Sequence, residues 1–280
     1  MSFTRTLSLA PLALLLTGPA GCFLVSGDDL NNVEMREALD EVVLEGQGQA
    51  VENEIVEITT DFTIGEGVAQ AAAALRDAIA SQIPCSTVTV ADDQLTLDFG
   101  GLDDSCVYNG HTFAGVVTLT ISHDQASNKI TVDHTYQDLS NGVVTLNGSK
   151  VVDWTSAARH IVTDLSVERD GKTAHTSSDR TQTLLDPAAG LAGGIQIDGE
   201  RRWDNERGTW ELAIADVELR WIDPVPQAGS YTLTTPKGKT AVLSFERIDD
   251  DTIAVTLSGG RKDRVFNVTR AGAVSDEGDA

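Results

Sequence analysis

Positive charge is scarce in this sequence. Its 280 residues include 20 Lys and Arg against 43 Asp and Glu, which gives a formal net charge of −23 at pH 7. Nucleic-acid binding needs clustered Lys and Arg to neutralise phosphates, so this balance argues against nucleic acid as a partner. It equally argues against electrostatic attachment to anionic lipid. The sequence predicts a well-solvated acidic surface, which affects solubility and encounter rates but does not specify a fold.

Motifs for catalysis and cofactor binding are also missing. Gly238-Lys239-Thr240 is the end of a phosphate-binding loop, but Leu233 stands where that motif requires its first glycine. The sequence has no Gly-x-Ser-x-Gly elbow and no His-Glu-x-x-His helix. Its five histidines include no i, i+4 pair and no neighbour of a cysteine, so a zinc site has no local support. We predict no catalytic residue, no metal ligand and no cofactor; a hydrolase with a dispersed site stays open.

An apolar run occurs near the N-terminus. The run from Leu7 to Leu16 follows Arg5 and is followed by the small residues of 17–21. It is about half the ~20 residues that a bilayer-spanning helix needs, so it is typical of a secretory signal peptide. We expect residues 1–21 to be removed.

The end of this segment, Ala20-Gly21-Cys22, resembles the lipobox of bacterial lipoproteins, although Pro19 stands where that family usually has an aliphatic residue. The resemblance implies that Cys22 is acylated, becomes the mature N-terminus and anchors the protein to a membrane. Phe23 follows the cysteine where Asp would signal inner-membrane retention in some bacteria, which favours the outer membrane of the cell envelope. The alternative is cleavage after Ala20, which would leave Cys22 as a free thiol.

Three cysteines are an odd number for an exported protein. If Cys22 carries lipid, Cys85 and Cys106 are left to form a disulfide bond in an oxidising compartment. Closing a loop of about twenty residues would contribute ~3 kcal/mol by restricting the unfolded chain.

A tether and a helical region are expected over 22–84. Apolar residues recur at helical spacing between Leu39 and Phe62, although Gly46 and Gly48 weaken this pattern. A stronger helix is predicted from about Gly65 to Gln82, because alanines supply helix propensity along a one-sided apolar stripe.

From Ser86 to Arg270, polar and apolar residues alternate between short turns, which predicts strands. Asn141-Gly142 and Asp170-Gly171 suit tight hairpin turns, and loops this short require antiparallel pairing. We expect a mainly β protein with an N-terminal helical segment, whose body is a large antiparallel meander sheet, curved or partly closed like a barrel. The predicted strands are 86–91, 94–99, 113–122, 129–137, 142–153, 159–169, 172–184, 194–204, 209–221, 229–235, 239–247, 252–258 and 263–269.

Three features of this body are predicted in more detail. Segment 172–184 has polar residues at both its odd and its even positions, so neither face of a strand here would be apolar. We therefore expect this segment at a sheet edge or beyond the core. The segment Asp223–Gly229 suggests a break between a meander at 85–222 and a second one at 223–270, which is either a subdomain or a continuation of the same sheet. Residues 271–280 are expected to be a flexible tail.

Two tryptophans flank the hairpin loop at 206–208. If Asp204 pairs with Thr209, Trp203 and Trp210 stand opposite each other on one face. Such a pair is typical of cross-strand packing, and an exposed pair could instead be a stacking platform for a flat ligand.

The sequence favours a membrane-anchored, non-enzymatic lipoprotein with a structural or binding role, whose protein or small-molecule partner is unknown. A carrier of lipid or another hydrophobic ligand is the main alternative. It predicts a continuous apolar lining, whereas the dispersed hydrolase predicts a concave pocket with perturbed titratable residues.

Overall fold

The computed structural model describes residues 29–38, 40–41, 76–77, 80, 83–91, 94–104, 106–108, 111–124, 126–127, 129–155, 158–220 and 222–279. The predicted signal peptide, Cys22 and most of the predicted helical region lie outside these residues. Residues 32–38 and 40–41 form a short helix near the N-terminus, and residues 76, 77 and 80 are also helical.

Strands make up most of the remaining structure. Those of the first part of the sheet are β1 (Thr87–Ala91), β2 (Gln94–Asp98), β3 (Cys106–Tyr108), β4 (His111–Asp124), β5 (Lys129–Ser140), β6 (Val144–Trp154), β7 (Ala158–Arg169) and β8 (Lys172–Leu184). Those of the second part are β9 (Ile195–Asn205), β10 (Gly208–Leu219), β11 (Ala228–Thr234), β12 (Thr240–Arg247), β13 (Thr252–Ser258), β14 (Arg264–Thr269) and β15 (Val274–Asp279). Short 3-10 turns occur at Leu102–Asp104 and Gly190–Gly193.

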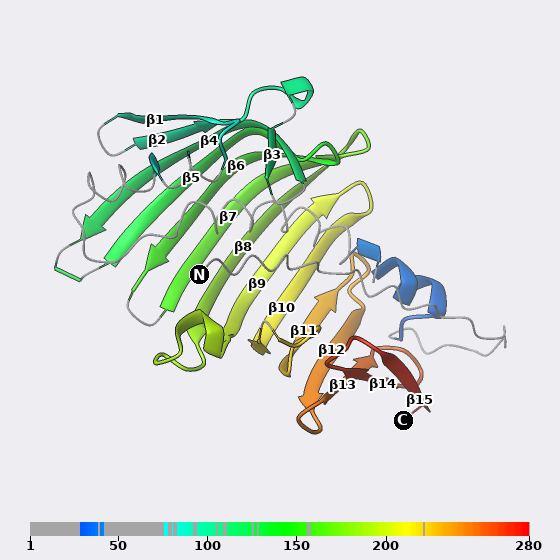
Figure 1. The fold of residues 1–280 in the computed structure, drawn as a ribbon. Helices are drawn as coiled ribbons and strands as arrows, with labels where there is room; N and C mark the ends of the chain where they lie inside the picture. Colours follow the sequence, from blue (N-terminus) through cyan, green and yellow to red (C-terminus); the bar gives the residue numbers. More distant parts are fainter. Residues whose placement is uncertain are drawn as a thin grey trace. The chain divides into compact units, whose positions relative to one another are not determined.

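These strands form one fifteen-stranded antiparallel meander, as predicted. The order is β1-β2-β4 and then each strand in turn to β15, with β3 paired to β4 off this path (Figure 1). Gly142 and Gly171 both have positive φ values, 83° and 72°, in the two turns whose glycines predicted hairpins. The order begins at β1 and ends at β15, so the sheet is open.

The chain divides into two compact units. Unit 1 comprises residues 1–43, 184–198 and 210–280, and unit 2 comprises residues 44–183 and 199–209. The division passes through β9 and β10, whereas the sequence suggested a break near Asp223. In the strand order, β11 to β14 follow β10 in the same sheet.

The core of unit 2 lies on one face of β2 and β4–β7. Side chains there alternate with exposed ones, and partners in register share the buried face: Leu97 lies opposite Val117, and Val117 lies opposite Tyr136. Burial of alternate apolar side chains is the main stabilising term of such a sheet. The sixteen buried residues of this core are Ile83, Leu95, Leu97, Phe99, Cys106, Phe113, Val117, Leu119, Ile121, Ile130, Val132, Tyr136, Leu139, Val144, Leu146 and Leu165.

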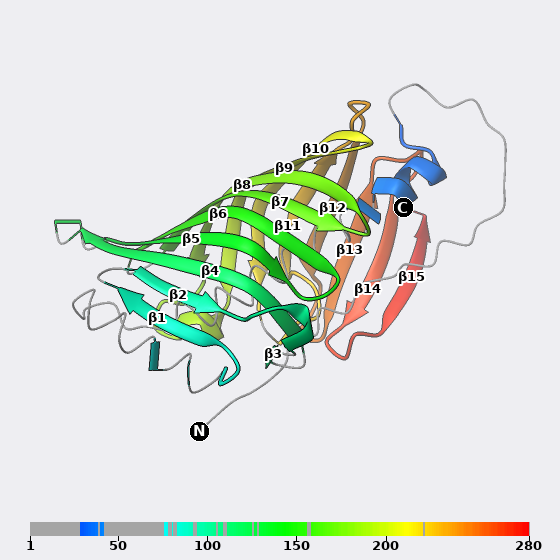
Figure 2. The same cartoon turned by 90° about the horizontal axis from the view of Figure 1, so that it is seen from above.

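The long strands of unit 2 bend along their length (Figure 2). The register shifts between Ala114 and Val116 where β4 meets β5, and between Tyr136 and Leu139 where β5 meets β6. Bulges of this kind increase the local twist and bend a strand. Gly148 lies beside the second bulge at φ 130°, where an added Cβ would stand 2.3 Å from the carbonyl oxygen of Asp164. Only glycine therefore fits there.

The expectation that segment 172–184 lies at an edge is wrong. The segment forms β8, which lies between β7 and β9, and one of its two faces is buried. The buried positions are Thr176, Ser178, Arg180 and Gln182. Sequence parity predicts which residues share a face, but a polar composition does not prevent burial where polar partners are available.

The tail also differs from its prediction as a flexible segment. Residues Val274–Asp279 form β15, paired antiparallel with β14 from Arg264 to Val268. Acidic residues are compatible with this position because an end strand has one side open to water. The three-residue strand β3 was not predicted, since a run so short has no measurable alternation.

The predicted disulfide bond is present. Cys85 and Cys106 are bonded with their Cα atoms 5.2 Å apart, within the usual range for this bond. It ties the segment before β1 to β3, and Cys106 is buried in the core of unit 2.

Replacing both cysteines by alanine should lower the free energy of unfolding by about 2–4 kcal/mol, because the bond constrains a long loop in the unfolded chain. Urea unfolding would measure the change. The reduced wild-type protein is the control and should resemble the double variant. Equal unfolding midpoints for the oxidised wild type and the double variant would contradict the prediction.

Candidate functional site

The two tryptophans singled out by the sequence are both buried. Trp203 is 2% exposed and Trp210 is 4% exposed. The hydroxyl of Thr209 donates a hydrogen bond to the carboxylate of Asp204, as expected if these residues pair across the hairpin. A stacking platform needs an exposed ring face, so this burial favours packing over ligand stacking.

One histidine and one aspartate form an exposed pair on the face of unit 2 that is opposite its buried face. His160 Nε2 lies 2.7 Å from Asp179 Oδ1, and the two side chains are 43% and 62% exposed. Among the residues that the structure describes, no group of three or more His, Cys, Asp or Glu is arranged to hold a metal ion. Water screens a pair this exposed, so it resembles a surface ion pair more than a catalytic dyad.

A row of polar side chains crosses the buried face of unit 2. The register places His134 of β5 opposite Lys150 of β6, Lys150 opposite Thr163 of β7, and Thr163 opposite Ser178 of β8. All four are buried, and Lys150 is 1% exposed. The hydroxyls of Thr163 and Ser178 are hydrogen-bonded at 2.7 Å. The face therefore changes from apolar at β2 and β4 to polar at β8.

This polar part of the face is rich in positive charge. Lys150, Arg180 and Arg201 are all buried, whereas the buried carboxylates of Glu41 and Asp223 belong to unit 1. Burying a cation is costly unless it is paired or hydrogen-bonded. Each of the three cations has a partner in the structure. In a chain with a net charge of −23, this concentration of buried cations was not apparent from composition.

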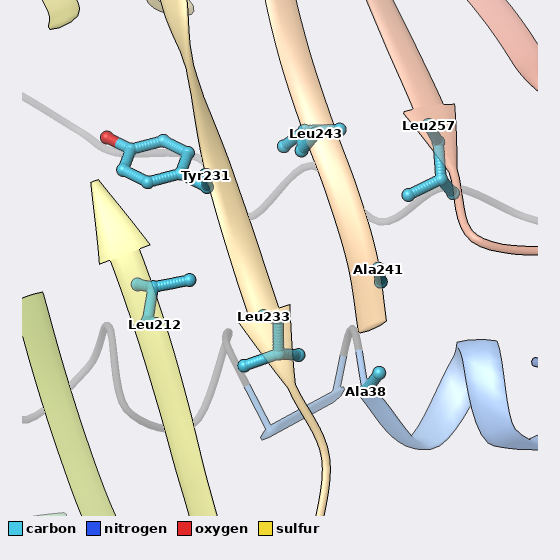
Figure 3. Close-up of a pocket in the computed structure, with 7 residues that line it drawn as sticks. All are labelled: Ala38, Leu212, Tyr231, Leu233, Ala241, Leu243 and Leu257. Atoms are coloured by element: carbon cyan, nitrogen blue, oxygen red, sulfur yellow. The ribbon is translucent and has the colours of Figure 1, made fainter. Parts of the chain in front are cut away.

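An apolar pocket lies in unit 1, lined by seven residues. Two successive cross-strand rows supply six of them: Tyr231, Leu243 and Leu257 in one row, and Leu212, Leu233 and Ala241 in the other. The seventh is Ala38, on the N-terminal helix (Figure 3).

Two of the residues that line the pocket are small. Ala38 and Ala241 each have only a methyl group, whereas most of the other lining residues are leucines (Figure 3). The space has a volume of about 60 Å³, several times the ~10–15 Å³ that one water needs. Genuinely empty cavities are apolar, and an apolar cavity has no groups with which to hold ordered water. The pocket can therefore take an uncharged aliphatic group.

The helix that carries Ala38 is fixed to the sheet at its N-terminus. Asn31 caps it: Oδ1 accepts hydrogen bonds from the main-chain N–H of Val33 and Glu34, and Glu34 Oε2 accepts one from Asn31 N. This reciprocal arrangement is a capping box. Lys239 Nζ then lies 2.7 Å from Glu34 Oε2 and donates to the carbonyl oxygen of Asp29. The hydrogen bond from Lys239 is the largest cause that lowers the pKa of Glu34.

Sequence reasoning missed both the polar row and the pocket. Lys150 shares its parity with Val152 and Trp154, which could have indicated burial, and Ala241 shares its parity with Leu243. Neither signal shows what faces these residues from other strands. That information comes only from the register.

Comparisons with known proteins identify no relative: the chain matches no protein-family model, no curated protein and no solved structure. Within the described residues, no helix has the length and apolar character required to cross a membrane. The geometry of the two units is therefore the basis for inferring a function.

Replacing Glu34 by glutamine should lower the free energy of unfolding at pH 7 by about 1–2 kcal/mol, because a charge-assisted hydrogen bond to Lys239 is lost. The pKa of Glu34 is lowered from 4.5 by folding, so its contribution is present above that pH. It is lost as the pH falls through the lower pKa of the folded state.

Melting temperatures of the wild type and the Glu34→Gln variant, measured from pH 7 to pH 3, would show this as a difference that shrinks in acid. Glu37→Gln, an exposed position on the same helix, is the matched control and should have little effect. A difference that is constant with pH would contradict the prediction.

Proposed function

We propose that this protein is a non-enzymatic binding lipoprotein of the cell envelope, anchored through lipid on Cys22 and carrying a site for an aliphatic group in unit 1. The anchor is supported by the signal-peptide pattern of residues 1–21 and by the resemblance of Ala20-Gly21-Cys22 to a lipobox. Its membrane is the outer membrane, in keeping with Phe23 after the cysteine. The acidic body faces the aqueous side.

The observation that carries the binding role is the apolar pocket. Its walls come from Ala38 and two rows of the sheet, so they rest on rigid elements and do not depend on loops. Binding sites for small molecules are ordinarily concave and mostly apolar. With lining side chains that are aliphatic apart from Tyr231, the ligand class is an uncharged hydrophobic group, such as a segment of an acyl chain or an apolar side chain.

Unit 2 is less suited to be the ligand site. Its apolar part is filled by its own side chains: Leu95, Leu97 and Phe113 are each 0% exposed, and Phe99 is 1% exposed. Phe99 and Phe113 pack with ring centroids 5.7 Å apart. A carrier with a continuous lipid cavity through unit 2 is therefore not favoured, and the pocket of unit 1 is the better site.

Replacing Ala241 by leucine should fill the pocket and weaken binding of xenon, an apolar probe small enough for a space of about 60 Å³, by about tenfold, equivalent to ~1.4 kcal/mol. Xenon NMR titration of the detergent-free Cys22→Ser chain would give the affinity. Ala213→Leu is the matched control, because Ala213 is exposed and lies on the opposite face of β10. Equal xenon binding by both variants would exclude the pocket as the site.

The anchor is tested separately. Cys22→Ser should move the protein from the membrane fraction to the soluble fraction, because one side chain supplies the lipid. Fractionation and intact-mass analysis of the wild type would measure location and acyl mass. Wild-type protein that lacks acyl mass, or a serine variant that stays in the membrane, would overturn the anchor without affecting the pocket.

A further inference from the structure

The two end strands of the sheet differ in their protection against pairing. β15 has the sequence Val-Ser-Asp-Glu-Gly-Asp, with three carboxylates in six residues, and its register with β14 is shifted at Val265 and Phe266. Charges and bulges are the usual means by which a protein keeps an edge strand from pairing with another chain. β15 therefore has the features of a protected edge.

β1 has none of these features. Its sequence is Thr-Val-Thr-Val-Ala, without charge or proline, and it pairs with β2 in unbroken register from Thr87 to Ala91. Val88 and Val90 are half-buried and pack against the core of unit 2, whereas Thr87, Thr89 and Ala91 are exposed. β-branched residues favour the extended conformation, so β1 is well suited to accept another strand.

The main chain of β1 can form a second ladder. In an antiparallel pair, alternate residues direct their N–H and C=O groups toward the neighbouring strand, and the remaining residues direct theirs away from it. In the strand order of the residues that the structure describes, β1 has one neighbour, β2, and occupies the end position. A short, uncharged strand in this position is a template for β-strand addition.

We propose that β1 is a docking edge for a second copy of this chain, and that two β1 strands pair antiparallel about a two-fold axis at Thr89. This inference goes beyond the proposed function and does not depend on it.

The sequence of β1 is complementary to itself in that register. Thr89 lies opposite Thr89 of the partner subunit, and Val88 lies opposite Val90 of the partner subunit. Alternate residues of β1 direct their main-chain N–H and C=O groups away from β2. Because the two-fold axis passes through Thr89, each of these N–H groups lies opposite a C=O of the partner subunit's β1, whichever alternate set it is. The Thr–Thr pair lies on the exposed side, where such cross-strand pairs are favourable, and the valines extend the apolar face.

Two copies of the chain could pair either through β1 or through β15, and the sequence of β15 favours β1. An antiparallel β15 pair would place a segment with three acidic residues in six beside its own copy. Like charges on facing strands repel and destabilise the pair. The uncharged edge can therefore self-associate, and the acidic edge opposes it.

Cysteine cross-linking of the purified full-length chain tests the register. In the proposed pair, Thr89→Cys places two cysteines directly opposite with Cα atoms about 4.5–5.5 Å apart, which suits a disulfide bond. Thr87→Cys is the matched control on the same strand, since its two copies would be about 14 Å apart at 3.4 Å per residue. Ser275→Cys is the control on β15. We expect covalent dimers, resolved on a non-reducing gel, to be about tenfold more abundant for Thr89→Cys than for either control.

A second measurement does not depend on introduced thiols. Thr89→Lys would place like charges opposite each other and should weaken the dimer, followed by sedimentation velocity, by about tenfold. Thr87→Lys adds the same charge away from its own copy and should weaken the dimer less. Equal cross-linking at residues 87 and 89, or a monomeric wild-type chain at all concentrations tested, would overturn the proposal.

Discussion

The continuous antiparallel ladder is the constraint on which the structure depends. Each strand from β4 to β14 pairs with the strands before and after it in the sequence, so one register determines the next. Because side chains alternate between faces, a shift of one residue would exchange the buried and exposed sets. Bulges at Tyr136–Leu139 and Ala215–Glu218 accommodate local bending while pairing resumes on both sides.

The same ladder produces different chemistry in the two units. In unit 1, successive rows bring Leu243 beside Leu257 and Ala241 beside Leu233, and a pocket remains because the alanines are short. In unit 2, the row that starts at His134 continues through Lys150 to hydroxyls on β7 and β8. A low-dielectric interior makes hydrogen bonds in such a row strong and makes missing ones costly. The pocket suits uncharged groups, whereas the polar row depends on satisfied partners.

Most strands were predictable because alternation and turn residues are local signals. Asn141-Gly142 and Asp170-Gly171 predicted tight turns, and the structure has positive φ at both glycines. Two errors have a common cause. Segment 172–184 was placed at an edge and residues 271–280 in a flexible tail because both are polar, yet both form strands. Backbone pairing does not require apolar side chains, and Ser178 and Arg180 are buried among polar neighbours that the sequence does not identify.

The sequence alone determined most of the strands, their antiparallel pairing and the disulfide bond between Cys85 and Cys106, because short loops and paired cysteines restrict the possible connections. It also supplied the prediction of an anchor at Cys22. Only the tertiary structure decided which side chains face each other across strands. The register places Lys150 beside Thr163, and two alanines line the pocket of unit 1. Such neighbours cannot be read from the sequence, because they depend on which residues of different strands are paired.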